Sequence, residues 1–219
     1  MGESMLNVKD RDLVIPGQLL GENLYHDLNC FRENNHVYSS VEGMVRIEGK
    51  RVKVIPSTGI YIPKEDDVII GVITNVLVDI FFVDINSPYN CSMRGEEVSK
   101  DAMKKDLSRY LKVGDIITAK ISEVNEVYSC QLIRPWKIEG GLIIDVNPKR
   151  VPRVIGKRRS MLNMIKEKTK SKIIVGQNGK IWIKGGNVDL AVRIIKRIER
   201  YAQTRGLTDK IAEILKKES

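Results

Sequence analysis

The segment Gly156-Lys157-Arg158-Arg159 joins one glycine to three cationic side chains. Ammonium and guanidinium groups bind phosphate oxygens, and a glycine lets a phosphate come close to the backbone N–H groups where a helix begins. No histidine and no pair of carboxylates accompanies them. The chemistry open to this segment is therefore the binding of an anion, and a helix must begin beside it.

The positive charge of the chain lies in its last third. Residues 141–219 hold 20 basic and 7 acidic residues, whereas residues 1–62 hold 7 and 8 and residues 63–140 hold 10 and 13. The formal net charge of +9 thus comes from one C-terminal module. A focused positive surface usually meets nucleic acid or anionic lipid, although a charge run can also be only a solvated face.

The pattern of apolar residues predicts the elements that position the cationic segment. It indicates strands over 141–146, 172–175 and 180–183, and helices over 148–155, 160–169 and from Asn187 onward. Gly156 ends the first helix, and Ser160 is placed to cap the second. Asn178-Gly179 suits the turn of a hairpin, because both residues tolerate positive φ.

This order of strand, helix, helix, strand, strand, helix resembles a KH domain. In that α+β family a G-x-x-G loop between the first two helices clamps the backbone of a single-stranded nucleic acid. The resemblance makes residues 156–159 the candidate loop. Arg159 stands in the place of the second glycine, so phosphate clamping by this loop is a hypothesis.

Residues 63–139 predict a five-stranded barrel. Runs rich in Val, Ile and Phe lie at 66–76, 78–85, 115–124 and 128–133, and residues 87–111 read as part loop and part helix. The region resembles an OB-fold barrel of the ribosomal-protein S-one type. The matching residues are Gly71, Phe82-Val83-Asp84 and Val113-Gly114-Asp115.

Barrels of this type bind single strands with a basic groove and exposed aromatic side chains. Phe82, Tyr89 and Arg94 are the candidates here. Phe82 has the motif position of a stacking residue, although a phenylalanine in an apolar strand more often packs in a core. Because the barrel is acidic overall and the chain is only 5% aromatic, we do not expect base stacking to be its main source of affinity.

Residues 1–62 predict a small domain made of strands. Residues 41–47 and 51–55 alternate apolar and polar side chains, and Gly49-Lys50 suits a hairpin turn between them. Residues 12–21 read as a strand interrupted by Pro16-Gly17. The whole chain is thus expected to be multidomain and mainly β, with the α+β KH module over residues 140–219.

The motifs in this order resemble those of the archaeal exosome RNA-binding cap subunits. The resemblance rests on VIPG, on YIPKEDDVIIGVI and VDINSPY, and on GKRRSMLNMI and GQNGKIWI. It implies a noncatalytic cap in three copies around the pore of a ring of ribonuclease-PH-like subunits, which degrades single-stranded RNA in the 3'-to-5' direction. It also implies that the N-terminal domain docks on the ring, for which the candidates are Val14, Ile15, Pro16 and Gly17.

Two further features follow from this resemblance. Gly176, Asn178 and Gly179 match the family's G-x-N-G element, which we interpret mainly as a structural hairpin rather than a contact with RNA. Asp66 stands where the family often has glycine, which puts the local turn in doubt.

Several classes of protein are disfavoured by composition. Three widely spaced cysteines and two histidines form no disulfide framework and no zinc-ligand pattern. No apolar run approaches the ~18 residues that span a bilayer, and the first residues lack the apolar core of a secretory signal. We therefore expect a cytoplasmic protein without metal or cofactor.

Two alternatives stay open. A free-standing transcription or translation factor is one, because an S-one-type barrel followed by KH occurs in antitermination factors, although those usually carry two KH units. A metal-dependent nuclease is the weaker one. Its only local support is Asp66-Asp67, and adjacent carboxylates at the entry of a strand point apart.

Overall fold

The computed structural model describes residues 5–99, 109–204 and 206–218. The chain divides after Gly59 into two compact units. The predicted loop and helix over 87–111 lie partly outside the described residues. Within the described part the prediction is wrong at residues 91–94, which form a strand, β11 (Cys91–Arg94), and residues 95–97 form a 3-10 turn, η1 (Gly95–Glu97).

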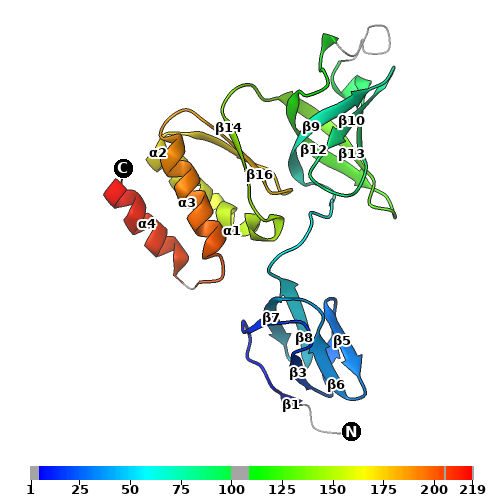
Figure 1. Cartoon of the computed structure of the whole chain (residues 1–219), viewed down its shortest axis with the longest axis vertical. Helices are drawn as coiled ribbons and strands as arrows, with labels where there is room; N and C mark the ends of the chain where they lie inside the picture. The colour runs from blue at the N-terminus through cyan, green and yellow to red at the C-terminus, as the bar shows by residue number, and fades with distance from the viewer. Residues whose placement is uncertain (1–4, 100–108, 205, 219) are drawn as a thin grey trace. The chain divides into compact units, whose positions relative to one another are not determined.

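Unit 1, residues 1–59, consists of two four-stranded sheets (Figure 1). The first has the order β1 (Met5–Leu6), β3 (Leu19–Glu22), β6 (His36–Ser39), β5 (Cys30–Glu33). The second has the order β2 (Leu13–Val14), β7 (Gly43–Glu48), β8 (Arg51–Pro56), β4 (Tyr25–His26). Apolar side chains from both sheets form one core that includes Val14, Leu20, Val37, Val45 and Val54. Burial of this shared face is what gives so short a segment a stable fold.

The predicted hairpin turn of unit 1 is confirmed, whereas the interrupted strand predicted over 12–21 forms two strands that belong to different sheets. Glu48 pairs with Arg51 across Gly49-Lys50. Pro16 and Gly17 separate β2 from β3, and the N–H of Gln18 donates to the C=O of Ile15 at 3.1 Å. Gly17 has φ +80°, which fits the third position of a type II turn.

Unit 2 begins with a closed barrel, as the sequence predicts (Figure 1). Its strands, in spatial order, are β10 (Ile80–Asp84), β11 (Cys91–Arg94), β13 (Cys130–Lys137), β12 (Ile116–Val124) and β9 (Val68–Val76). Alternate residues of each strand point inward, and Phe81, Ile69, Ile117 and Leu132 are almost fully buried there.

The KH domain completes unit 2 with the predicted order of elements. They are β14 (Leu142–Asp145), α1 (Val151–Ile155), α2 (Ser160–Thr169), β15 (Lys172–Val175), β16 (Lys180–Lys184) and α3 (Val188–Arg200), followed by α4 (Leu207–Glu218). The sheet order is β14, β16, β15, and the helices cover one of its faces (Figure 1). Asn187 caps α3, because its side chain accepts from the N–H of Leu190 at 3.0 Å.

Two details of the helices differ from the prediction. The first helix is split into a 3-10 turn, η4 (Pro148–Arg150), and α1, which begins only at Val151 so that Pro152 lies in its first turn. Ser160 does not cap α2. The cap position belongs to Arg159, whose side chain makes no capping hydrogen bond.

Candidate nucleic-acid interface

The cationic loop lies between α1 and α2, where the sequence places it. Gly156 has φ +74° and ψ 170°, and Lys157–Arg159 form a 3-10 turn, η5, that leads into α2. A Cβ at position 156 would lie 2.7 Å from Cβ of Met161 and 2.8 Å from its backbone nitrogen. Only glycine fits this position, both for its φ and for the space.

Arg159 keeps the backbone that a glycine would have. Its φ is +63° and its ψ is 16°, and Arg158 also has positive φ, at 52°. A non-glycine residue in this left-handed region costs roughly 1 kcal/mol. The second glycine of the G-x-x-G pattern is therefore absent as a residue but its backbone path is retained.

The electrostatics of the loop favour an anion. Lys157, Arg158, Arg159 and Ser160 are all exposed. Among the described residues, no carboxylate forms an ion pair with any of these three cations. The first N–H groups of α2 have no side-chain cap, so their partial positive charge adds to that of the loop.

The second candidate of the KH domain, the hairpin at 176–179, is buried against the barrel. The predicted hairpin is present, but its turn is centred one residue earlier than expected: the N–H of Gly179 donates to the C=O of Gly176 at 3.1 Å, and Gly179, at φ +89°, has positive φ whereas Asn178 does not. Asn178 is fully buried. Its Nδ2 donates to the carbonyl oxygens of Ile70 at 2.7 Å and Ile85 at 2.9 Å, and its Oδ1 accepts from the N–H of Ile70 at 3.2 Å.

Gln177 extends this contact along the same strand. Its N–H donates to the C=O of Val68 at 2.8 Å, and its Oε1 accepts from the N–H of Val68 at 3.0 Å. The turn thus pairs with the part of β9 that β10 leaves free, since β10 pairs only with residues 72–76. A Cβ at Gly176 would lie 2.3 Å from Oδ1 of Asn178 and 2.9 Å from the nitrogen of Ile70. The element's polar groups serve the contact between the domains.

An apolar cluster reinforces the same contact. Ile143, Trp182 and Ile174 are in register across the three KH strands, on the face that the helices leave free. They pack with Ile70, Ile116 and Ile138 of the barrel side. The barrel and the KH sheet therefore share a small core.

On the barrel, β10 directs Phe82 outward and Phe81 inward. Phe81 is fully buried, whereas Phe82 is 36% exposed. Phe82 lies opposite Ser92, and Arg94 lies opposite Ile80 two residues along β11, so Phe82 and Arg94 share the outer face as diagonal neighbours. Arg94 also makes an exposed ion pair with Glu96 at 3.5 Å.

Tyr89 lies apart from that pair, in the loop between β10 and β11. Its ring packs on that of Tyr128, with centroids 5.0 Å apart and an angle of 42° between the planes. The structure therefore brings two of the three barrel candidates together on one strand pair and places Tyr89 in a separate aromatic contact.

Sequence reasoning missed Trp136, the most exposed aromatic side chain among the described residues, at 73%. It lies near the end of β13, opposite Thr118 of β12. Arg134, with φ +51°, and Pro135 disturb the strand just before it. The run R-P-W-K, a tryptophan between two cations after a proline, is the signal that could have found it.

The two carboxylates considered for a metal have other partners. Asp66 accepts from Nζ of Lys120 at 2.7 Å, which lowers the pKa of its carboxyl. Asp67 accepts from the hydroxyl of Tyr61 at 2.7 Å, but burial raises the pKa of its carboxyl. No group of three or more His, Cys, Asp or Glu side chains is placed to hold a metal within the described ranges. Asp66 has φ +70° and so, like Arg159, lies in the left-handed region that favours glycine.

In unit 1, the four docking candidates separate by exposure. Val14 is buried in the core, whereas Ile15, Pro16 and Gly17 are exposed in the turn. Ile15 is one of several large apolar side chains of this unit that are more than half exposed, together with Met5, Leu13, Tyr25 and Leu28. Uncovered apolar side chains in such number favour a protein partner for this unit.

Family profiles match all three regions of the chain. Residues 11–57 match the Exosome RNA binding protein RRP4 N-terminal domain, residues 61–133 the S1 domain of Exosome complex component RRP40, and residues 141–189 the KH domain. In the described residues, no helix is long and apolar enough to span a membrane.

Two similar proteins share the same name. Exosome complex component Rrp4 of Methanothermus fervidus is 43% identical over 96% of this chain and 98% of its own length. The Pyrococcus furiosus protein of the same name is 42% identical over 95% of this chain and 84% of its own. A crystal structure of a protein assigned to the RNA-binding proteins of the exosome superposes with a TM-score of 0.65 and 37% identity, over 73% of this chain and 97% of that one.

Proposed function

The chain belongs to the Rrp4 family of exosome components, which are noncatalytic RNA-binding subunits, and from this premise we propose how it works. The chain captures single-stranded RNA on unit 2 and delivers it to a ring of ribonuclease-PH-like subunits for 3'-to-5' degradation. Unit 1 docks on that ring, and three copies surround its pore in the cytoplasm. These last features rest on the family resemblance and on the exposed apolar side chains of unit 1.

One observation carries the RNA-binding role. The KH loop presents Lys157, Arg158 and Arg159, which no carboxylate of the described residues pairs with, beside an uncapped helix start. Such a loop contacts phosphates and not base edges, so it holds RNA without selecting a sequence. A cap that feeds many different transcripts into one pore needs this kind of contact.

A double substitution of the loop tests this role. In the full chain, Lys157→Gln with Arg158→Gln should weaken binding of a single-stranded RNA and reduce the slope of log affinity against log salt by about 1.4, at about 0.7 per phosphate contact. The matched control is Lys168→Gln with Lys170→Gln, which removes the same charge from exposed positions at the other end of α2. Equal effects of the two variants would mean that net charge, and not the loop, binds RNA.

A second experiment tests docking by unit 1. Ile15→Asp should reduce the amount of ring subunits that co-purify with the tagged chain, because it places a charge on an exposed apolar turn. Lys50→Asp is the control, since Lys50 is an exposed residue of a different turn in the same unit. The mass of the intact complex tests the number of copies. Undiminished co-purification with Ile15→Asp would remove this turn from the docking surface.

A further inference from the structure

A pocket lies beside the contact between the barrel and the KH sheet. Its volume is about 490 Å³, which is within the range of ligand sites. Its walls include Trp136, Lys137, Glu139, Ile174, Trp182 and Lys184. It is thus built by the end of β13 and by the helix-free face of β15 and β16.

The two tryptophans of the pocket differ in their environment. Trp182 is 9% exposed, and its Nε1 donates to the C=O of Gly140 at 2.6 Å. Trp136 is 73% exposed, although its backbone is held in the barrel by pairing with β12. A large ring on a fixed strand that leaves most of its surface in water is a ready platform for a flat ligand.

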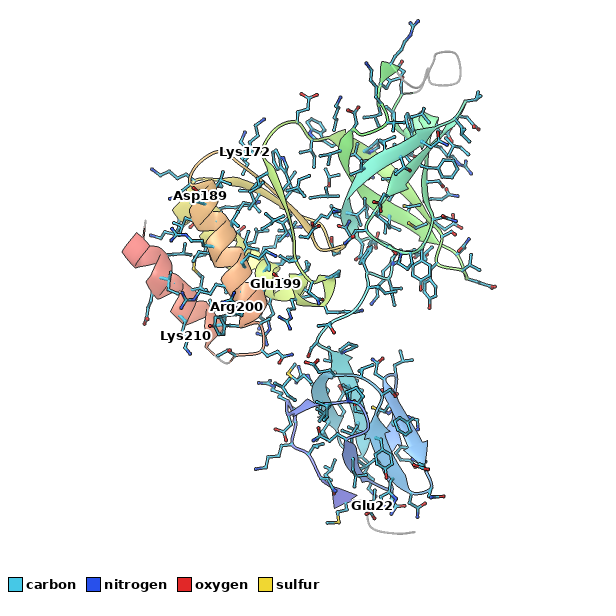
Figure 2. All side chains as sticks on the ribbon, in the orientation of Figure 1. Glu22, Lys172, Asp189, Glu199, Arg200 and Lys210 are labelled. Atoms are coloured by element: carbon cyan, nitrogen blue, oxygen red, sulfur yellow. The ribbon has the colours of Figure 1, made fainter. Side chains whose placement is uncertain are left out.

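Two lysines lie at the KH side of the pocket. Lys172 and Lys184 lie directly opposite each other on β15 and β16, on the same face as Ile174 and Trp182, and both are exposed. Figure 2 labels Lys172. Like charges in directly opposed positions destabilise a sheet, and an anion between them would relieve that cost.

The carboxylates near the pocket engage only part of this charge. Lys137 forms ion pairs with Asp115 at 3.0 Å and Glu139 at 3.6 Å. Nζ of Lys184 donates to the backbone C=O of Glu139 at 2.8 Å, and in the described part of the chain no carboxylate forms an ion pair with it. The rim is therefore cationic on the KH side, and its charge is complementary to a polyanion.

We propose that this pocket is a nucleotide subsite for single-stranded RNA, in which a base stacks on Trp136 and the adjoining phosphates contact Lys172 and Lys184. The subsite rests on the proposed function, and it adds a base contact to the phosphate contacts of the KH loop. Stacking accepts every base, because each has a π face, so the subsite increases affinity without selecting a sequence. An RNA strand that contacts both the KH loop and this subsite therefore runs from the KH domain to the barrel.

Fluorescence tests the subsite, because Trp136 and Trp182 are the two tryptophans of the chain. A single-stranded oligoadenylate added to the full chain should quench the emission of the exposed tryptophan. Trp136→Ala should abolish that quench and weaken binding about 5- to 150-fold, which is the range for loss of one stacked base. Trp136→Phe should retain most of the affinity, because a phenyl ring still stacks.

Matched variants separate stacking from general effects. Tyr25→Ala removes an exposed aromatic side chain from unit 1 and should leave RNA affinity unchanged. Lys172→Gln with Lys184→Gln should reduce the salt slope by about 1.4, as two phosphate contacts require. Because Trp136 is exposed, its substitution should not change the thermal midpoint of the chain, which circular dichroism checks.

Three results would overturn the subsite, and they differ from failure of the proposed function. RNA that binds without quenching, or that binds Trp136→Ala as tightly as Tyr25→Ala, overturns the subsite alone. Unchanged RNA affinity with reduced co-purification of ring subunits for Trp136→Ala would assign the pocket to a protein partner. If the unaltered chain binds no RNA at low salt, the proposed function fails and the subsite fails with it.

Discussion

The KH domain contains two glycine-led connections that look alike in sequence and lie in opposite environments. The loop at 156–159 is exposed and cationic, and no carboxylate of the described residues pairs with it. The hairpin at 176–179 is uncharged, and its amide groups are hydrogen-bonded to the barrel. Glycine is required in both, but at 156 the obstacle is the following helix and at 176 it is Asn178 and the neighbouring domain.

These environments determine which of the two connections can contact a ligand. The Asn178 amide uses both of its donors and one of its two acceptor lone pairs on backbone groups of the barrel, and its complete burial keeps it out of reach of RNA. An exposed guanidinium beside an uncapped helix start keeps nearly all of its hydrogen-bonding capacity free for a ligand. We therefore propose that the first connection binds RNA, whereas the second holds two domains together.

The largest effect is expected at Asn178. Asn178→Ala should lower the free energy of unfolding by about 3 kcal/mol, because the backbone groups of Ile70 and Ile85 stay buried and lose their partner. Urea denaturation followed by the fluorescence of Trp182, which lies in the same contact, measures it. Asn163→Ala, at an exposed position of α2, is the control. A change below about 0.5 kcal/mol, as for ordinary surface substitutions, would show that the hairpin does not hold the domains.

The next largest effect is expected from salt, which should weaken RNA binding at the loop but not the contact of the hairpin with the barrel. The three phosphate contacts at the loop contribute about −2 to the salt slope, so by themselves they should lower RNA affinity roughly 20-fold between about 50 and about 200 mM salt. The urea midpoint of unit 2 should stay nearly constant over the same range, because the hydrogen bonds of Gln177 and Asn178 join uncharged groups. If salt weakened the hairpin contact in parallel with RNA binding, the two connections could not have the different roles given to them here.

A smaller effect is expected at Arg159. Arg159→Gly should raise the free energy of unfolding by about 1 kcal/mol, because glycine takes φ +63° without strain. The same variant should reduce the salt slope of RNA binding by about 0.7. Arg159→Ala serves as the control, since it removes the charge but keeps the strain. If glycine and alanine gave equal stability, backbone strain at this position would be absent.

The smallest effect is expected at a third turn that contains glycine, residues 112–115, which the carboxylate of Asp115 stabilises. Asp115 accepts from the N–H of Lys112 at 2.9 Å and from Nζ of Lys137 at 3.0 Å, and the first of these bonds is the main cause of its lowered pKa. A lowered folded pKa stabilises the protein above the unfolded value near 3.8, and this contribution is lost as pH falls through the folded pKa.

Asp115→Asn should therefore cost under about 1 kcal/mol at neutral pH and still less in acid. Urea midpoints between neutral pH and acid measure the difference. The deficit of Asn178→Ala should not vary with pH in this way, because an amide does not titrate. A pH-independent deficit for Asp115→Asn would exclude the carboxylate as its cause.

The order of elements could be predicted because it depends on local patterns. The apolar periodicity of α3, the cap at Asn187 and the turns at Gly49-Lys50 and Asn178-Gly179 all act within a few residues. Ser160 failed as a cap because the left-handed backbone of Arg159 moves the helix start by one residue, and no local pattern predicts positive φ at arginine.

The features that could not be predicted from the sequence depend on tertiary structure. In the pair Phe81-Phe82, alternation alone cannot say which ring faces inward, since each register of residues 78–85 holds three apolar residues and one aspartate. The partners of Asn178 lie about a hundred residues earlier in the chain, so local rules see only a hairpin. Trp136 would be assigned to a core by its residue type, and only the barrel's geometry leaves it in water.

The pairing of the hairpin with β9 has a consequence for synthesis of the chain. Ile70 precedes Asn178 by 108 residues, and a ribosome adds about 5–20 residues per second. The edge of β9 therefore emerges roughly 5–20 s before the segment that covers it. During that interval its main-chain groups are open to pairing with other nascent chains, which is how exposed strand edges aggregate. A barrel produced without the KH domain would keep that edge open permanently.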